Sequence, residues 1–142
     1  MVPGVSAAIA VPAAAGIPVT HRGFASSFAV VTGHEDPAKP ASAVDWERLA
    51  TAVDTLVILM GVSALPRIAA RLLAAGRGVD TPAAVIHRGT TEAEETVVGT
   101  LGDIAARAAE IQAPAVIVIG EAVAFRSMLS RSLLDAVAFD HR

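Results

Sequence analysis

The sequence predicts an α/β domain in which a mixed, mostly parallel sheet is flanked by helices. Three observations lead to this class. Short apolar runs alternate along the chain with segments of helical periodicity, and glycine ends most of the runs. Two neighbouring runs are joined by a short polar connection, which predicts at least one antiparallel pair. At 142 residues, the whole chain (1–142) is expected to form one domain.

The predicted elements of the first half are a helix after Ser6, a strand Phe28–Thr32, a helix Val44–Val53, a strand Thr55–Met60 and a helix Ser63–Ala75. Serine is a favoured helix cap, whereas Pro12 inside the first helix predicts a kink or an early end. Gly33 and Gly61 stop the two apolar runs, which is typical of buried strands. Gly76 follows an amphipathic pattern and predicts a helix end. The polar, proline-containing stretch His34–Ala43 predicts a surface loop.

The predicted elements of the second half are a strand Pro82–His87, a strand Glu95–Leu101, a helix Ile104–Ile111, a strand Ala115–Ile119 and a helix from about Ala122 to Val137. Gly89 breaks the first of these strands, and the alternating second strand predicts a sheet edge. Asp103 stands where it can cap the helix that follows. The β-branched run after Pro114 is typical of a strand that is buried on both faces.

The composition excludes several classes of function. The absence of cysteine rules out disulfides and thiolate sites, and a net charge of −3 with 4% aromatic residues argues against nucleic-acid binding. No apolar stretch approaches the roughly 20 residues of a membrane span, and we expect a cytoplasmic protein without a membrane partner. No metal is expected, because the candidate ligands lack chelating spacing: His21, His87, Glu35 and Asp36.

The first residues have the pattern of a loop that follows a preceding strand. Val2–Ser6 contains a Pro-Gly turn and leads directly into an apolar helix, with one residue before it. We therefore expect the chain to begin in the middle of a protein, as a fragment. The alternative is that Met1 starts a small domain that stands alone.

Four motifs occur in order along the chain: GIPVTHR (16–22), VTGHE (31–35), LMG (59–61) and HRGTT (87–91). With these motifs the chain resembles the C-terminal domain of the uroporphyrinogen-III C-methyltransferases, within the tetrapyrrole methylase family. Residues 1–10 resemble the linker between the two domains. The N-terminal domain of the family, with its glycine-rich loops, has no counterpart in this chain.

The resemblance implies methyl transfer from S-adenosylmethionine to carbon atoms of uroporphyrinogen III, which gives precorrin-2 in tetrapyrrole biosynthesis. It also implies a homodimer and a site between two α/β domains, so the isolated chain is expected to be inactive. The alternative is a truncated module that binds ligand or dimerises without catalysis. The nucleotides upstream of Met1 distinguish the two, because only the first hypothesis requires an in-frame N-terminal domain.

For the substrate, the resemblance implies contacts from Arg22, His34 and Met60. An arginine suits a polycarboxylate, because the guanidinium binds a carboxylate in a bidentate manner. His34 follows a strand end, where α/β folds bind ligands, and is also the candidate general base for the proton that the methylated pyrrole must lose. The residues alone favour the alternative that Arg22 and His34 are ordinary polar loop residues and that Met60 is a core methionine.

For the cofactor, S-adenosylmethionine, the resemblance implies contacts from Ser6, Ala7, Met60 and Gly89. Ser6 and Ala7 belong to the linker, and the backbone near Met60 and Gly89 is expected to contact adenine. Ala115 is a further, weaker candidate for the same pocket. Gly61 lacks a side chain, which allows another group to approach its backbone closely.

Overall fold

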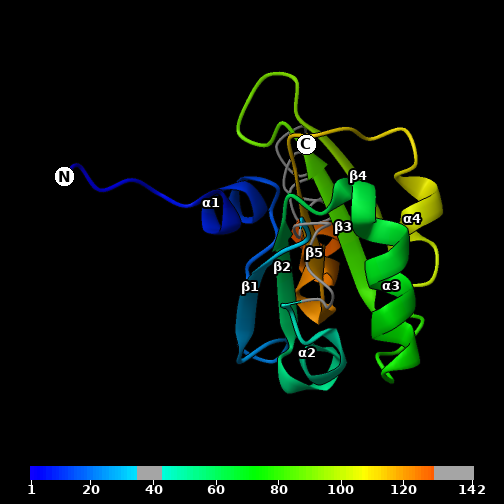
Figure 1. Cartoon of the computed structure of the whole chain (residues 1–142). Helices are drawn as coiled ribbons and strands as arrows, with labels where there is room; N and C mark the ends of the chain where they lie inside the picture. Colours follow the sequence, from blue (N-terminus) through cyan, green and yellow to red (C-terminus); the bar gives the residue numbers. More distant parts are fainter. Residues whose placement is uncertain (35–42, 130–142) are drawn as a thin grey trace, which may run out of the picture.

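The computed structural model describes residues 1–34 and 43–129 of the chain. Within them, five strands form one sheet of order β1-β2-β5-β3-β4 (Figure 1). The strands are β1 (Phe28–Thr32), β2 (Thr55–Leu59), β3 (Pro82–His87), β4 (Glu95–Thr100) and β5 (Ala115–Ile119). The helices are α1 (Ala7–Ala14), α2 (Trp46–Ala52), α3 (Leu65–Ala74) and α4 (Ile104–Arg107), with 3₁₀ turns η1 (Val62–Ala64) and η2 (Glu121–Ala124). All five predicted strands are confirmed to within one residue at each end.

The mixed α/β class is confirmed, but the prediction of a mostly parallel sheet is wrong. Only β1 and β2 pair in parallel, whereas β2–β5, β5–β3 and β3–β4 are antiparallel. Since β5 is antiparallel to both of its neighbours, β1, β2 and β3 still run in one direction. The helical connection from β2 to β3 leaves room for one strand between them. Strand β5 occupies this place and runs antiparallel to both. Hydrophobic periodicity carries no information on that direction.

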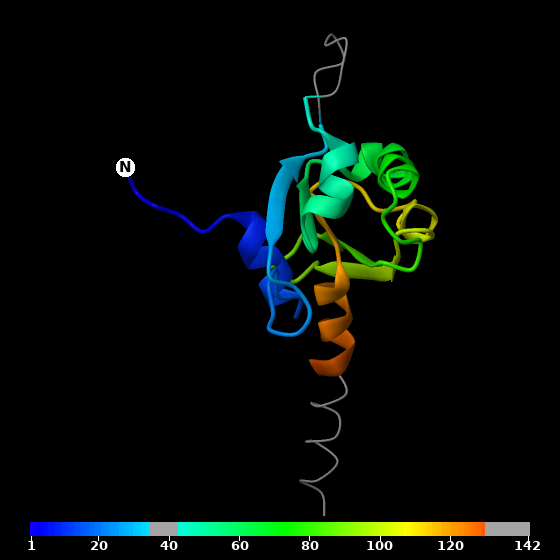
Figure 2. The same cartoon turned by 90° about the horizontal axis from the view of Figure 1, so that it is seen from below.

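The sheet is covered on both faces (Figure 2). Helices α2, α3 and α4 pack on one face, where they bury alternate strand residues such as Leu56, Val85 and Ile117. Helix α1 covers the other face and buries Val57 and Val118 among others. Because β2, β3 and β5 are enclosed from both sides, their sequences are continuously apolar rather than alternating. The predicted two-sided burial of Ala115–Ile119 is confirmed, because its last four residues are buried.

Predicted helix ends are confirmed at Ser6 and Gly76, and Gly16 ends a helix in the same way as Gly76. The N–H of Ala8 donates to Ser6 Oγ (3.2 Å), so Ser6 caps α1. Gly16 and Gly76 follow α1 and α3 with φ angles of +74° and +95°, a conformation that glycine adopts without strain. Pro12 lies inside α1, which continues for two further residues and ends at Ala14.

Two predictions in the second half need correction. The helix expected over 104–111 ends at Arg107, and Asp103 makes no capping hydrogen bond. Its carboxylate instead accepts from the N–H of Thr100 and pairs with Arg107, so it holds the turn before the helix. The helix expected over 122–137 begins as η2 and is helical at 125–129; the remainder lies outside the described residues, as does 35–42 of the predicted loop.

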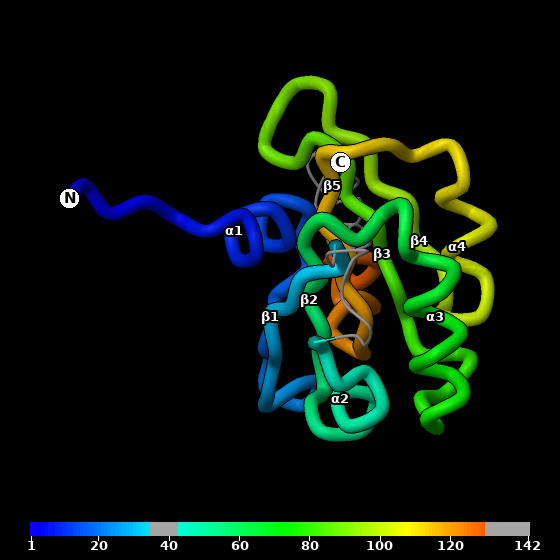
Figure 3. Tube along the Cα trace, viewed as in Figure 1, coloured from blue at the N-terminus to red at the C-terminus, as the bar shows by residue number. Residues whose placement is uncertain are grey.

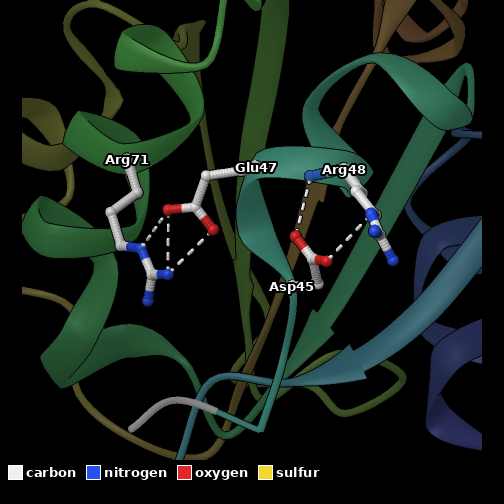
Figure 4. A network of polar contacts seen from close by, with 4 residues as sticks. All are labelled: Asp45, Glu47, Arg48 and Arg71. Carbon is white, nitrogen blue, oxygen red and sulfur yellow. Dashed lines mark hydrogen bonds and ion pairs between the residues drawn. The ribbon is translucent and has the colours of Figure 1, made fainter.

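Polar contacts join α2 to its neighbours (Figure 4). Asp45 caps α2 through the N–H of Arg48 (3.0 Å), and Arg71 of α3 donates to both oxygens of Glu47. The bond to Arg71 lowers the pKa of the Glu47 carboxyl. Beyond α3, the buried Arg77 donates to backbone carbonyls, Asp54 among them (2.6 Å). Within the described residues, none of the helices has the length and apolar character that a bilayer crossing requires.

Candidate functional site

A cavity of about 1070 Å³ opens at the edge of the sheet where β1, β2 and β3 end. The loops that leave these strands and the segment that enters β5 meet there (Figure 3). The N–H of Arg88, after β3, donates to the carbonyl of Pro114, before β5 (3.0 Å), and thereby joins two of these segments. The first residues of α1 and the chain before them complete the wall with Val5, Ala7, Ala10 and Val11.

Backbone strain is concentrated around this cavity. Among the described residues, three that are not glycine have positive φ: Met60 (+54°), Arg88 (+45°) and Thr90 (+70°). All three line the cavity, directly after β2 or β3. Left-handed conformations are costly for residues with a side chain and tend to be kept where function requires them. The position of all three therefore makes this edge of the sheet the candidate functional site.

Glycines allow the loops to pack closely at the rim. A Cβ atom on Gly61 would lie 2.7 Å from Ile58 Cγ2, so the group that approaches Gly61 closely belongs to the protein itself. A Cβ atom on Gly89 would lie 2.4 Å from Val11 Cγ1. Gly89 therefore brings the loop after β3 onto α1, which closes one side of the cavity.

The wall of the cavity is predominantly apolar, and the titratable side chains that line it among residues 1–34 and 43–129 are His34 and Arg88. Thr32 holds the backbone of His34 on both sides, because its hydroxyl accepts from the His34 N–H (3.2 Å) and donates to the His34 carbonyl (3.1 Å). Glu94 accepts from the N–H of Thr90 (2.9 Å) and steadies the loop after β3. In the part of the chain that the structure describes, no three His, Asp or Glu side chains come close enough to bind a metal.

The structure brings most of the predicted site residues together. Ala7, His34, Met60 and Gly89 all line the cavity, and so does the weaker candidate, Ala115. Ser6 does not line it, but it caps α1 directly beside Ala7. The Met60 side chain is 65% exposed, so the interpretation as a core methionine is wrong.

Arg22 lies apart from the other predicted residues. It is exposed on the turn between His21 and Ala25, which precedes β1 and so lies at the opposite edge of the sheet. The His21 ring packs on Phe125 (4.3 Å between centroids), and Asp54 accepts from the N–H groups just after the turn. Arg22 and His34 therefore do not face one cavity in this chain.

Sequence reasoning missed several residues of the cavity wall. Arg88 and Thr90 belong to the HRGTT motif. Their left-handed backbone conformation could not be predicted from the sequence, because residues with a side chain ordinarily avoid that conformation. Pro114 was expected only to precede a strand, and Gln112 and Ala113 were not singled out, yet all three line the cavity. For these three residues no sequence signal pointed to a site.

The chain matches a known protein family over most of its length. The family described as tetrapyrrole (corrin/porphyrin) methylases matches residues 1–105. The chain belongs to the tetrapyrrole methylase family. An S-adenosyl-L-methionine-dependent uroporphyrinogen III methyltransferase of Methanosarcina barkeri is 51% identical over 91% of this chain and 51% of its own length. A uroporphyrinogen-III C-methyltransferase of Priestia megaterium is 46% identical over 88% of this chain and 53% of its own length. The chain thus spans about half the length of these curated relatives.

Solved structures agree with the fold of this methylase domain. The uroporphyrin-III C-methyltransferase of Thermus thermophilus in complex with S-adenosylhomocysteine superposes with a TM-score of 0.72 at 37% identity. The match covers 86% of this chain and 52% of that one. A cobalt precorrin-4 methyltransferase of cobalamin biosynthesis superposes with a TM-score of 0.74 at 26% identity, with the same coverage. Both neighbours are methyltransferases of tetrapyrrole pathways.

Proposed function

We propose that this chain is the C-terminal half of an S-adenosylmethionine-dependent uroporphyrinogen-III C-methyltransferase that forms precorrin-2. The family match and the names of the relatives support this activity. The proposal includes an N-terminal domain outside this chain, a cytoplasmic homodimer, and no methyl transfer by the chain alone. The cavity at the ends of β1, β2 and β3 is the single observation that carries it.

The cavity suits the adenosyl part of S-adenosylmethionine. Its volume of about 1070 Å³ is at the upper end of ligand pockets, and its wall is apolar with backbone groups at the strand ends. A flat, weakly polar base fits such a wall, and polar main-chain groups at strand ends can bind its edge. Ala7, Met60 and Gly89 would hold this group, with Ser6 fixing the backbone of α1 beside it.

His34 is proposed to face the reacting part of the substrate. When bound, S-adenosylmethionine supplies a methyl group that is electrophilic because the sulfur is positively charged. Methylation of the pyrrole carbon would leave the ring positively charged until the ring loses a proton, and an imidazole can accept one near neutral pH. His34 is exposed at the rim of the cavity on a backbone that Thr32 holds in place, which suits that role.

Arg22 remains the predicted carboxylate ligand, with one condition that its position imposes. Because the turn His21–Ala25 lies at the other edge of the sheet, Arg22 would have to meet a substrate outside this cavity. A second copy of the chain in the proposed homodimer could satisfy that condition. The alternative function, a module that binds the ligand without catalysis, uses the same cavity and differs only in lacking a catalytic partner domain.

Calorimetric titration of the purified chain with S-adenosylhomocysteine tests the proposal. We expect binding of S-adenosylhomocysteine and of adenosine, but not of methionine. Met60→Glu places a charge on the apolar wall and should weaken binding by about tenfold or more. Met128→Glu is the matched control, because Met128 is also exposed (51%) but does not line the cavity. Absence of binding, or equal losses in both variants, would contradict the proposal.

Joining the chain to the proposed N-terminal half distinguishes the two functions. The gene upstream is expected to encode that half in frame, and the joined protein should transfer labelled methyl groups to uroporphyrinogen III. Binding without transfer in the joined protein would favour the non-catalytic module.

A further inference from the structure

A second, smaller hollow of about 290 Å³ lies beside the cavity. It is lined by Gly33, His34, Ser63, Ala64 and Arg67. His34 and Ser63 line both spaces, so the two hollows are neighbours that share one wall. Whatever lies in the large cavity is therefore next to whatever lies in the small one.

The two hollows differ in chemical character. The large cavity is mainly apolar, whereas the small one presents a guanidinium, an imidazole and a hydroxyl from Arg67, His34 and Ser63. All three can donate hydrogen bonds, and no acidic side chain lines the small hollow within the described residues. The Arg67 side chain makes no hydrogen bond or ion pair with the part of the chain that the structure describes. The hollow therefore has the chemistry to receive an anion.

The local position of Arg67 does not favour a positive charge. Arg67 lies in the first turn of α3, where the helix dipole disfavours cations, and no acidic residue shares that turn. By contrast, Arg71 one turn later pairs with Glu47 of α2 (2.9 Å), so its place has a structural reason. An anion bound in the small hollow would pair with Arg67 as Glu47 pairs with Arg71.

We propose that the small hollow binds a carboxylate arm of the tetrapyrrole substrate, with Arg67 and Ser63 as the residues that recognise it. The inference rests on the proposed function, and it identifies carboxylate-recognition residues on the cavity side of the sheet. A guanidinium binds a carboxylate through two parallel hydrogen bonds, and a hydroxyl can add a third. His34 stands between this carboxylate and the cavity for the adenosyl group, next to the place where the ring must lie.

Binding of uroporphyrin III, the oxidised and fluorescent form of the substrate, tests this hollow. The purified chain is titrated as wild type, Arg67→Gln, Ser63→Ala and Arg48→Gln, each with and without S-adenosylhomocysteine. Arg48→Gln is the matched control, because it removes the same charge from an exposed side chain on α2 that does not line either hollow. Coproporphyrin III, which keeps the ring but carries fewer carboxylates, is the matched ligand.

We expect Arg67→Gln to weaken uroporphyrin binding by roughly tenfold or more and Ser63→Ala by a smaller factor, with Arg48→Gln close to wild type. The loss should shrink for coproporphyrin, and affinity for S-adenosylhomocysteine should stay unchanged in every variant. Equal affinity of Arg67→Gln and wild type for uroporphyrin would overturn the inference, and so would a wild-type chain that binds neither porphyrin. If S-adenosylhomocysteine still bound in either case, the proposed adenosyl site would remain supported. If S-adenosylhomocysteine did not bind, the result would count against the proposed function itself.

Discussion

Gly33 and Gly61 touch backbone to backbone at the rim of the cavity. A Cβ atom on Gly33 would lie 2.3 Å from the Cα atom of Gly61, closer than any side chain permits. The N–H of Gly33 also donates to the carbonyl of Leu59 (2.7 Å). This contact fixes the ends of β1 and β2 relative to each other and thereby places His34 beside Met60.

Gly33→Ala should therefore disturb both stability and binding. The added methyl group meets backbone rather than a flexible side chain, so the ends of β1 and β2 must separate. We expect a loss of about 1–3 kcal/mol in the free energy of unfolding, measured by urea denaturation, and weaker binding of S-adenosylhomocysteine. Gly4→Ala is the control, because nothing lies within 4 Å of its added Cβ atom. An unchanged Gly33→Ala protein would mean that the two strand ends are not held by this contact.

Met60→Gly should separate stability from binding. Glycine removes the strain of φ +54°, which costs about 1 kcal/mol for a residue with a side chain. Glycine also raises the conformational entropy of the unfolded chain, which lowers stability. We expect unfolding free energy to stay level or rise by up to about 1 kcal/mol, while affinity for S-adenosylhomocysteine falls. Met60→Leu keeps the strain and should gain no stability. A clear loss of stability in Met60→Gly would show that the side chain serves packing instead.

Asp54 should stabilise the protein at neutral pH, and this contribution should be lost in acid. Its carboxylate accepts from the N–H groups of Ser26 (2.8 Å) and Ser27 (3.0 Å) and from the Ser27 hydroxyl, and these bonds lower its pKa. A carboxyl with a lowered pKa contributes stability above its unfolded-state value, near 3.9, and loses it as pH falls through the folded-state value. Asp54→Asn should therefore be less stable than wild type at pH 7, and the gap should narrow as pH falls below about 4. A gap that is constant with pH in urea denaturation would contradict this role.

Arg77 should contribute to the stability of the fold although it lies far from the cavity. Its guanidinium is buried and donates to the carbonyls of Ala50, Val53, Asp54 and Ile119, which belong to the end of α2 and the neighbouring ends of β2 and β5. Burial lowers its pKa. Arg77→Met leaves these carbonyls without a donor, and we expect a loss of about 2 kcal/mol or more in thermal or urea unfolding. Arg48→Met, on the exposed face of α2, should change stability by less than about 0.5 kcal/mol. Similar losses in the two variants would refute the assignment.

The strands were predictable because their cause is local. The run Ala115–Ile119 is apolar at every position, and the structure buries Ile117 and Val118 on opposite faces of the sheet. Strand direction was not predictable, since the gap that β5 fills is created by the connection between β2 and β3. Asp103 was misread for a related reason, because its acceptor oxygens serve Thr100 and Arg107 rather than the helix end.

The clustering of candidate residues was predictable where motif and strand end coincide. His34, Met60 and Gly89 each follow a strand of the same direction, so the fold brings them to one edge. Arg22 follows a helix instead, and its turn is held by Phe125 near the other end of the chain and by the residues next to Asp54. Arg67 was not singled out, because an arginine at the start of an amphipathic helix is typical of a solvated face.

Residue-resolved amide shifts on titration with S-adenosylhomocysteine locate the adenosyl group on the protein. We expect the largest shifts at Ala7, Met60, Gly89 and Ala115, with little change at Ser26 on the opposite edge of the sheet. Shifts concentrated around Ser26 and the turn before it, or no shift at any of these amides, would contradict this location of the adenosyl group.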